Sequence, residues 1–448
     1  MQKLTIKNQF MGVRPCEIEF TKFLLLIGEQ ASGKSTIAKL IFFFQTLPDA
    51  LYEGAINARQ NSSTFDYIAH INKIARQRFL ETFGPTSRNE GFEISFQYNH
   101  SSSLKIYQGA DRMTYAEFSD SFGFSLGGVV KSYVNGIKID IDQSLEEVRI
   151  RQILRADLDR LFSRETTQHN YIIASRSVLV GYPETFEKVI EQEYEKLLED
   201  EVKKEDFEKR QRLGNELLLY QFVNWSKGVR NIFKNNGQTF ERVAYILENR
   251  EDLQYIMQIV KNVLKGQYRS SEAGEVIIPN GSTQKVALKD ASSGQQEVLR
   301  LLQGIFLAIG LPNRKEFFVV EEPEAHLFPL AQKELINAFA VFLNSIPQGR
   351  MVITTHSPYV LSCINILLFA NYVSSNAEKS SHRGEIAEIP RSYWLNSSYF
   401  NAYSLGQSEE YCINIKDIDT GLIAQNYLDL ISEQLGSEYQ DLYNLLLS

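Results

Sequence analysis

Cysteine is scarce in this sequence. The three cysteines, Cys16, Cys363 and Cys412, stand far apart in a chain of 448 residues, and none belongs to a C-x-x-C pair. A disulfide framework or a cysteine zinc site needs several cysteines at short spacings, so the sequence argues against both. This usage fits a reducing compartment, and we expect a cytoplasmic protein.

Long hydrophobic runs are also missing. The start, Met1–Lys7, has no apolar core of a signal sequence, and the apolar stretch Ile37–Phe44 is much shorter than a membrane helix of roughly 18 residues. We therefore expect no membrane segment.

Positive charge is not in excess. The 47 lysines and arginines stand against 55 aspartates and glutamates, for a formal net charge of −8. Bulk charge therefore gives no general attraction to nucleic acid or to a membrane, although a local basic patch remains compatible with it. Hydrophobic residues make up 43% and charged residues 23%, as in an ordinary soluble globular protein, and the length suggests about two or three lobes.

The hydrophobic pattern predicts an α/β fold. Phe23–Ile27 is a continuous apolar run, which is typical of a strand buried on both faces of a sheet. Residues 37–47 predict a helix that Pro48 halts, and residues 91–96 and 103–107 predict a β-hairpin.

From about Pro183 to Asn236 the pattern changes to long solvated helices with both charge signs. Strand signals return at residues 275–278 and 285–288, and helices and strands then alternate to about residue 419. The tail, residues 403–447, predicts a strand pair followed by an amphipathic helix that would pack on the core or on a partner. We predict an N-terminal part of a split nucleotide-binding domain at 1–180, a helical insert at 181–270, a C-terminal part at 271–420 and a C-terminal helix at 421–448.

A glycine-rich loop follows the buried strand. Gly28–Ser35 matches G-x-x-x-x-G-K-[ST] between a predicted strand and a predicted helix. Backbone N–H groups must close around phosphates there, so Gly28 and Gly33 supply conformations that a Cβ would block. Lys34 would offset the charge of the β- and γ-phosphates, Ser35 would ligand Mg²⁺, and the helix N-terminus would add partial positive charge. The expected ATP contacts are Gly28, Gln30, Ala31, Ser32, Gly33, Lys34, Ser35 and Thr36.

Two adjacent carboxylates follow another buried strand. Phe317–Val320 is apolar and is followed by Glu321 and Glu322. Paired acids at the carboxyl end of a strand would lie beside the phosphates, where Glu321 would hold Mg²⁺ and Glu322 would orient and deprotonate the attacking water. A strand that ends in two solvated acids without a function would have the same sequence pattern. The phosphate loop elsewhere in the chain favours the functional interpretation.

Small and hydroxyl residues open a third segment. Ser292, Ser293, Gly294 and Gln295 precede an apolar helix and would form an anion site for the nucleotide. An ordinary helix N-cap with Glu297 in the first turn has a similar sequence, so this pattern is weak on its own.

A histidine ends the apolar strand Met351–Thr355. A lone histidine is more often structural, but the position of His356 after a buried strand predicts a sensor of the γ-phosphate.

The order of these motifs resembles the ABC-type ATPases of the SMC/RecF/OLD group. The sequence Glu322–Pro329 is similar to the OLD-like branch, and Tyr171–Ser177 is similar to its "YIPAERS" motif near the Q-loop. The resemblance implies a P-loop ATPase of the ABC type that uses ATP and Mg²⁺. It also implies that ATP is sandwiched between two subunits, with Ser293 and Gly294 of one copy facing Lys34 of the other.

The sequence departs from this group at two places. Gln30-Ala31 stands where these ATPases usually have Asn-Gly, and Ser293 replaces the first glycine of L-S-G-G-Q. Neither change removes a catalytic group. After His356 we find no acidic motif of a Toprim nuclease, so we expect no such domain in this chain.

Three functions remain open at this stage. The chain resembles the ATPase subunits of bacterial anti-phage defence systems of the PtuA and AriA kind, which implies a homo-oligomer that controls a separate nuclease or toxin. A DNA-repair ATPase of the RecF or SMC type would instead clamp duplex DNA, a reading that the acidic net charge weakens. A nuclease with an unrecognised site in the helical insert is the third alternative.

Overall fold

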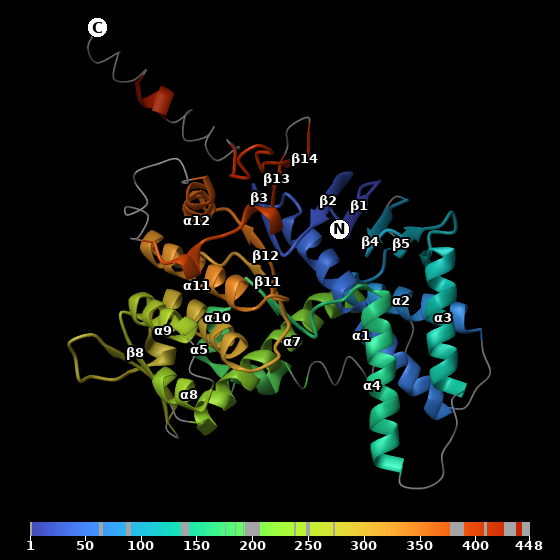
Figure 1. Cartoon of the computed structure of the whole chain (residues 1–448), viewed down its shortest axis with the longest axis horizontal. Coiled ribbons are helices and arrows are strands. Elements are labelled where there is room, and N and C mark those ends of the chain that lie inside the picture. The colour runs from blue at the N-terminus through green and yellow to red at the C-terminus, as the bar shows by residue number, and fades with distance from the viewer. Residues whose placement is uncertain are drawn as a thin grey trace. The chain divides into compact units, whose positions relative to one another are not determined.

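The computed structural model divides the chain into two compact units, each assembled from three separate segments. The first comprises Met1–Phe20, Ser35–Tyr171 and Lys188–Gln221, and the second comprises Thr21–Lys34, Ile172–Glu187 and Phe222–Ser448. Figure 1 labels their elements. The structure describes residues 2–61, 66–86, 91–135, 143–174, 176–183, 185–190, 192, 207–236, 239–247, 251–271, 274–376, 389–406, 410–424 and 436–440.

The first unit contains an antiparallel sheet in the order β2-β1-β4-β5-β6. Its strands are β1 (Gln2–Ile6), β2 (Cys16–Phe20), β4 (Glu93–Gln97), β5 (Ser103–Gln108) and β6 (Thr114–Phe118). Burial alternates along the strands, and the buried residues Leu4, Ile18 and Phe96 are direct neighbours in the register. One face of the sheet is therefore apolar. The pairing of β4 with β5 confirms the predicted β-hairpin.

Aromatic rings fill the core of this unit. Its helices are α1 (Lys34–Asn61), α2 (Tyr67–Phe83), α3 (Asp120–Asn135) and α4 (Gln143–Leu161). Phe44 of α1 stacks on Phe96 of the sheet with ring centroids 4.8 Å apart, and Phe43 meets Phe79 of α2 edge-on at 5.4 Å. Such pairs stabilise a core beyond the area that they bury.

The predicted end of α1 at Pro48 is wrong, because the helix continues through this residue to Asn61. A proline lacks the N–H that would bond the carbonyl four residues earlier, which here belongs to Phe44. The buried Tyr98 hydroxyl donates a hydrogen bond of 3.0 Å to this carbonyl oxygen. A side chain from the sheet thus replaces the missing backbone donor, and sequence reasoning along the helix alone does not reveal it.

The second unit contains the mainly parallel sheet, in the order β14-β13-β3-β12-β11-β7. Its strands are β3 (Phe23–Gly28), β7 (Gln168–Ile172, which crosses from the first unit), β11 (Glu316–Glu321), β12 (Arg350–Thr355), β13 (Phe400–Leu405) and β14 (Cys412–Asn414). β3 pairs in parallel with β13 and β12, and β12 pairs in parallel with β11. The carboxyl ends of β3, β12 and β11 therefore meet at one edge.

Helices make up much of the rest of the described second unit. They are α5 (Ser177–Gly181), α7 (Phe207–Asn236, which begins in the first unit), α8 (Phe240–Ile246), α9 (Glu251–Leu264), α10 (Ser293–Gly310), α11 (Pro329–Ser345) and α12 (Pro358–Asn376). Helix α11 packs against α9, α10 and α12. This arrangement confirms the predicted α/β fold with a split nucleotide-binding domain, while the predicted boundaries at 180, 270 and 420 remain predictions.

A smaller antiparallel sheet has the order β10-β9-β8. Its strands are β8 (Gly266–Ser271), β9 (Gly274–Pro279) and β10 (Val286–Ala287), and the 3₁₀ turn η1 (Leu288–Asp290) follows β10. The strand predicted at 285–288 is therefore shorter than expected. Two further 3₁₀ turns, η4 (Arg391–Tyr393) and η5 (Ser397–Tyr399), lead into β13.

The predicted strand pair of the tail is confirmed by β13 and β14. Of the C-terminal helix predicted at 421–448, residues 436–440 are helical, and most of the rest lies outside the described residues. Among the described helices, α12 is long and apolar enough to span a membrane by length and composition alone. Its Val360, Ile364 and Leu368 are buried in the second unit, whereas Ile366 and Phe369 are 50% and 51% exposed, and 33% of the span is buried.

Candidate functional site

The glycine-rich loop joins β3 to α1 in a conformation that only its glycines allow. Gly28 has φ +146°, and a Cβ there would lie 1.9 Å from the carbonyl oxygen of Leu405 on β13. Gly33 has φ +92°. The close approach of β13 therefore leaves no room for a side chain at Gly28, where the strand turns into the loop.

Ala31 occupies the position where the resembling ATPases usually have glycine. Its φ is +62°, a left-handed conformation that costs an alanine about 1–2 kcal/mol relative to the right-handed region. The loop holds the glycine-like shape in spite of the substitution. The departure seen in the sequence thus adds strain to the loop.

Lys34 is buried at the start of α1, and its ammonium group points back into the loop. It donates hydrogen bonds to the carbonyl oxygens of Gly28 (2.9 Å) and Glu29 (2.7 Å) and to the hydroxyl oxygen of Ser32 (3.3 Å). Ser35 and Thr36 follow it in the first turn of α1, the position predicted for a magnesium ligand and a phosphate contact.

The paired carboxylates stand at the end of β11, as predicted. Glu321 is 8% exposed, and its Oε2 accepts a hydrogen bond from the N–H of Ala174 (3.3 Å). Glu322 turns out of the strand with φ +43°, while its N–H bonds the carbonyl oxygen of Thr354 (2.9 Å). This left-handed conformation costs about 1–3 kcal/mol, and such strain is concentrated at functional sites.

His356 lies between Lys34 and Glu322. Its Nδ1 is 3.5 Å from the Lys34 Nζ, and its Nε2 is 3.2 Å from Glu322 Oε1. The structure therefore brings together three residues predicted from separate motifs, which we call the Lys34–His356–Glu322 group. Glu322 and His356 follow the ends of β11 and β12, and Lys34 begins α1 after the loop that follows the adjacent strand β3.

Glu324 fixes the backbone of His356, a role that the sequence did not assign to it. Its Oε1 accepts hydrogen bonds from the N–H of His356 (2.8 Å) and from the Thr355 hydroxyl (2.6 Å). Tyr411 is a second residue that sequence reasoning missed, and its hydroxyl donates to the Ser32 carbonyl oxygen (2.6 Å). An acid two positions after Glu322 was a visible signal for the first, whereas nothing near Tyr411 in the sequence points to the loop.

A fully buried ion pair joins the end of β11 to α10. Arg176 and Glu297 are both 0% exposed, and the arginine Nε is 3.2 Å from the Glu297 Oε2. The arginine also donates from Nη1 to the carbonyl oxygens of Ile173 and Glu321, each at 3.1 Å. The other oxygen of Glu297 accepts from the N–H of Ser177 (3.0 Å). Of the Tyr171–Ser177 motif, Ser175 lies outside the described residues.

The signature segment, Ser292–Gln296, opens α10. Ser292 caps the helix: its hydroxyl oxygen accepts the Gln295 N–H (3.3 Å), and Gln295 Oε1 accepts the Ser292 N–H (3.1 Å). The ordinary N-cap that the sequence also allowed is therefore present. Gly294 is required sterically, because a Cβ there would lie 2.6 Å from the His326 carbonyl oxygen. Glu297 does not take part in the cap, since it is buried against Arg176.

This segment opens onto a cavity of about 670 Å³, where the exposed Phe328 forms part of the wall. Ser292 and Ser293 are exposed, and within the described residues neither makes a hydrogen bond with Lys34, His356 or Glu322. The structure thus does not bring the signature segment to the Lys34–His356–Glu322 group of the same chain.

The family model described as "AAA ATPase domain" matches residues 1–361. The chain belongs to the AAA ATPase domain family. This match covers the glycine-rich loop, the paired carboxylates and His356 of the AAA ATPase, so the three motifs fall within one family domain.

Two solved structures are similar to this AAA ATPase. The SMC head domain from Thermotoga maritima is 11% identical, with a TM-score of 0.36 and coverage of 93% of this chain and 98% of that chain. The Smc head domain with a coiled coil and joint derived from Pyrococcus yayanosii is 11% identical, with a TM-score of 0.37 and coverage of 97% and 100%. No curated protein matches the chain.

Proposed function

We propose that this protein binds ATP at the Lys34–His356–Glu322 group and hydrolyses it. The observation that carries the proposal is the convergence of a phosphate-type loop, a strained glutamate and a histidine at one sheet edge.

The residues suit separate tasks in phosphoryl transfer to water. The Lys34 ammonium would leave the loop carbonyls to contact the β- and γ-phosphates, and Glu322 would accept a proton from the attacking water. Its neighbour His356 would contact the γ-phosphate. Ser35 and Glu321 would hold Mg²⁺, which offsets the charge of the phosphates when bound.

We further propose that each site is completed by the signature segment of a second copy. Ser293 is exposed. Within the described residues, no member of the signature segment makes a hydrogen bond with the Lys34–His356–Glu322 group of its own chain. The exposed Phe328 and Leu330 beside it are 77% and 54% exposed, which suits a surface that another subunit covers. ATP between two copies would bring Ser293 and Gly294 of one to Lys34 of the other.

The same proposal extends to the use of ATP. Assembly on ATP would hold or release a separate nuclease or toxin in bacterial anti-phage defence, as the sequence resemblance implies. The test is co-purification with the products of adjacent genes, with and without ATP. An effector should associate with this protein when ATP is present. Glu322→Gln should stabilise this association, and Lys34→Ala should abolish it. If neither substitution changes the association, control by ATP is contradicted.

Assembly can be measured directly by analytical ultracentrifugation. With ATP, Glu322→Gln should shift to a dimer or a larger oligomer, because it binds ATP without consuming it. Lys34→Ala should sediment as it does without ATP, because it lacks the phosphate contact. An unchanged mass of Glu322→Gln at saturating ATP would count against ATP-driven assembly, unless both proteins are already oligomers.

The affinity for ATP should depend on pH through Lys34. Burial lowers the pKa of its ammonium to about 8, although Glu322, Glu324 and Glu29 act in the opposite direction. Phosphate contact favours the charged form, so binding above pH 8 takes up a proton, and affinity should fall by up to about tenfold per pH unit there. Below that pH, Lys34 is already charged and contributes no pH dependence.

A titration with a non-hydrolysable ATP analogue between about pH 6.5 and 9.5 tests this linkage. Lys34→Arg is the matched control, because a guanidinium stays charged across this range and should remove the pH dependence. A wild-type affinity that is constant up to pH 9.5 would show that Lys34 does not gain a proton on binding.

A further inference from the structure

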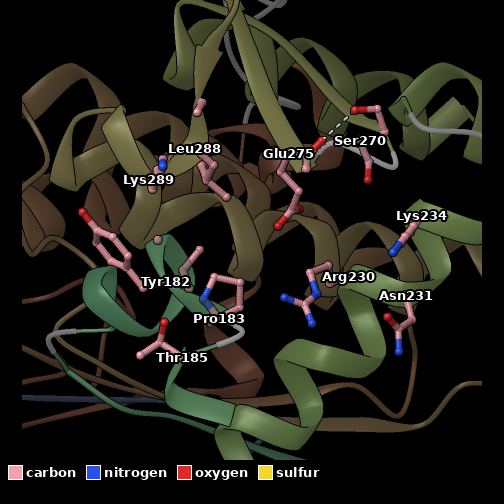
Figure 2. A pocket seen from close by; sticks show the side chains of 15 residues that line it. Tyr182, Pro183, Thr185, Arg230, Asn231, Lys234, Ser270, Glu275, Leu288 and Lys289 are labelled. Atoms are coloured by element: carbon pink, nitrogen blue, oxygen red, sulfur yellow. Dashed lines mark hydrogen bonds between the residues drawn. The ribbon is translucent and has the colours of Figure 1, made fainter. Parts of the chain in front are cut away.

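A second cavity lies in the second unit, apart from the Lys34–His356–Glu322 group. Its volume is about 460 Å³, within the range of small-molecule sites. Its walls are the end of α5 with Tyr182 and Pro183, a face of α7, the β8–β9 hairpin and the η1 turn. Figure 2 shows Tyr182 and Lys289 at one end, Arg230, Asn231 and Lys234 at the other, and the Glu275 carboxylate between them.

Positive charge dominates the α7 end of this cavity. Arg230 and Lys234 are one helical turn apart on the same face of α7, with the Asn231 amide beside them. Arg230 is neutralised by Glu187, with N···O distances of 2.8 and 3.0 Å. Within the described residues, neither Lys234 nor Lys289 has a carboxylate partner. Among the described residues, Lys234 at the α7 end and Lys289 at the opposite end are thus uncompensated, and each favours an anionic ligand.

A fixed acceptor stands in the middle of the cavity. Glu275 is held by Arg300 at 2.7 and 3.0 Å and by the Tyr268 hydroxyl at 2.6 Å. Burial alone would raise the pKa of this carboxyl, but Arg300 holds it below its ordinary value, so the group is ionised. A carboxylate repels phosphate and accepts hydrogen bonds from hydroxyl groups. The cavity thus combines a place for an anion with a place for hydroxyl donors.

We propose that this cavity binds a small phosphorylated sugar compound, either a mononucleotide or a sugar phosphate. The phosphate contacts Lys234, the Arg230 guanidinium and the Asn231 amide. The sugar hydroxyls donate to Glu275. A base, where one is present, stacks on the half-exposed ring of Tyr182 at the other end.

The wall of this cavity also contacts the signature segment. Gln296 Nε2 donates to the carbonyl oxygens of Leu288 (2.9 Å) and Lys289 (3.0 Å), which belong to η1. On the other side of the glutamine, a Cβ at Gly181 would lie 3.1 Å from its side-chain atoms. A ligand in the cavity therefore lies against two elements that hold Gln296 in the first turn of α10.

Calorimetric titration of the full-length Lys34→Ala protein tests the site without the contribution of the phosphate loop. The probes are AMP, ribose 5-phosphate, adenosine and inorganic phosphate. We expect AMP or ribose 5-phosphate to bind with Kd below about 1 mM, and adenosine and inorganic phosphate to bind at least about tenfold more weakly. In the same Lys34→Ala protein, the further substitution Lys234→Ala should lower the affinity for the phosphorylated probe at least about tenfold, since a charge-assisted contact is lost.

Matched variants separate the site from general electrostatics. Lys234→Arg should retain binding, and Lys285→Ala, the same charge change at an exposed position outside the cavity, should leave it unchanged. If the ligand is a nucleotide, Tyr182→Ala should lower the affinity for AMP and leave that for ribose 5-phosphate unchanged. If the ligand is a sugar phosphate, ribose 5-phosphate should remain the probe that binds most tightly. Either outcome supports the proposal.

Three results would overturn it. The first is weak binding of every probe, with Kd above about 10 mM. The second is equal loss of affinity in Lys285→Ala and Lys234→Ala. The third is retention of a single-stranded oligonucleotide through Lys234 while AMP and ribose 5-phosphate fail to bind, which would assign the cavity to nucleic acid.

Discussion

Replacing Glu322 with glutamine should lower the rate of ATP hydrolysis at least about 100-fold, because it removes the proposed base that accepts a proton from water. Glutamine has nearly the same shape and can adopt the same backbone, including the left-handed φ of +43°. We therefore expect the affinity for ATP to change by less than about threefold, since the lost interaction acts mainly in the transition state. Single-turnover phosphate release and a separate binding titration measure the two effects.

The control for this prediction is Glu53→Gln, the same chemical change on an exposed position of α1. Its hydrolysis rate should equal that of the wild type. A Glu322→Gln protein that hydrolyses ATP at the wild-type rate would show that the assigned base is wrong, even if Lys34 proves essential.

Breaking the Arg176–Glu297 pair should have the largest effect on stability. Both side chains are fully buried, and removing one partner leaves the other charge without compensation. Arg176→Met and Glu297→Gln should each lower the free energy of unfolding of the second unit by about 3–5 kcal/mol. Arg176→Met should also slow hydrolysis, because the arginine holds the carbonyl oxygen of Glu321, directly before the proposed base Glu322.

A double-mutant cycle distinguishes this pair from two independent core defects. The double variant Arg176→Met/Glu297→Gln should lose clearly less stability than the sum of the single variants, because neither charge is then left unpaired. Urea unfolding, followed by a probe in the second unit, gives the values. Strictly additive losses would mean that the pair carries no specific interaction.

The sequence predicted the elements that local patterns encode. The burial of β3, the loop conformation at Gly28 and Gly33, and the position of Glu321 and Glu322 at a strand end each depend on neighbouring residues. The start of α10 followed from the small residues Ser292–Gly294 and the apolar helix behind them, whereas the anion site predicted there stays a prediction.

Contacts between distant segments could not be predicted in the same way. Arg176 and Glu297 meet across 121 positions of sequence, so Glu297 looked like part of a helix cap. Tyr98 supplies the hydrogen bond that lets α1 continue through Pro48, and it comes from the strand region rather than from the helix. Tyr411 reaches the loop from a separate hairpin. Periodicity and turn chemistry say nothing about which of these side chains will meet.

The central claim is that each active site takes Lys34 from one copy and Ser293 from another. Mixing two inactive variants tests it most directly. Lys34→Ala lacks the phosphate contact, and Ser293→Arg places a bulky side chain at an exposed position where the partner's ATP would lie. Each should be inactive alone, whereas every mixed dimer should contain one intact site, so an equal mixture should recover at least about a quarter of the wild-type rate. A mixture as inactive as its parents after subunit exchange, or full activity of Ser293→Arg alone, would contradict the shared site.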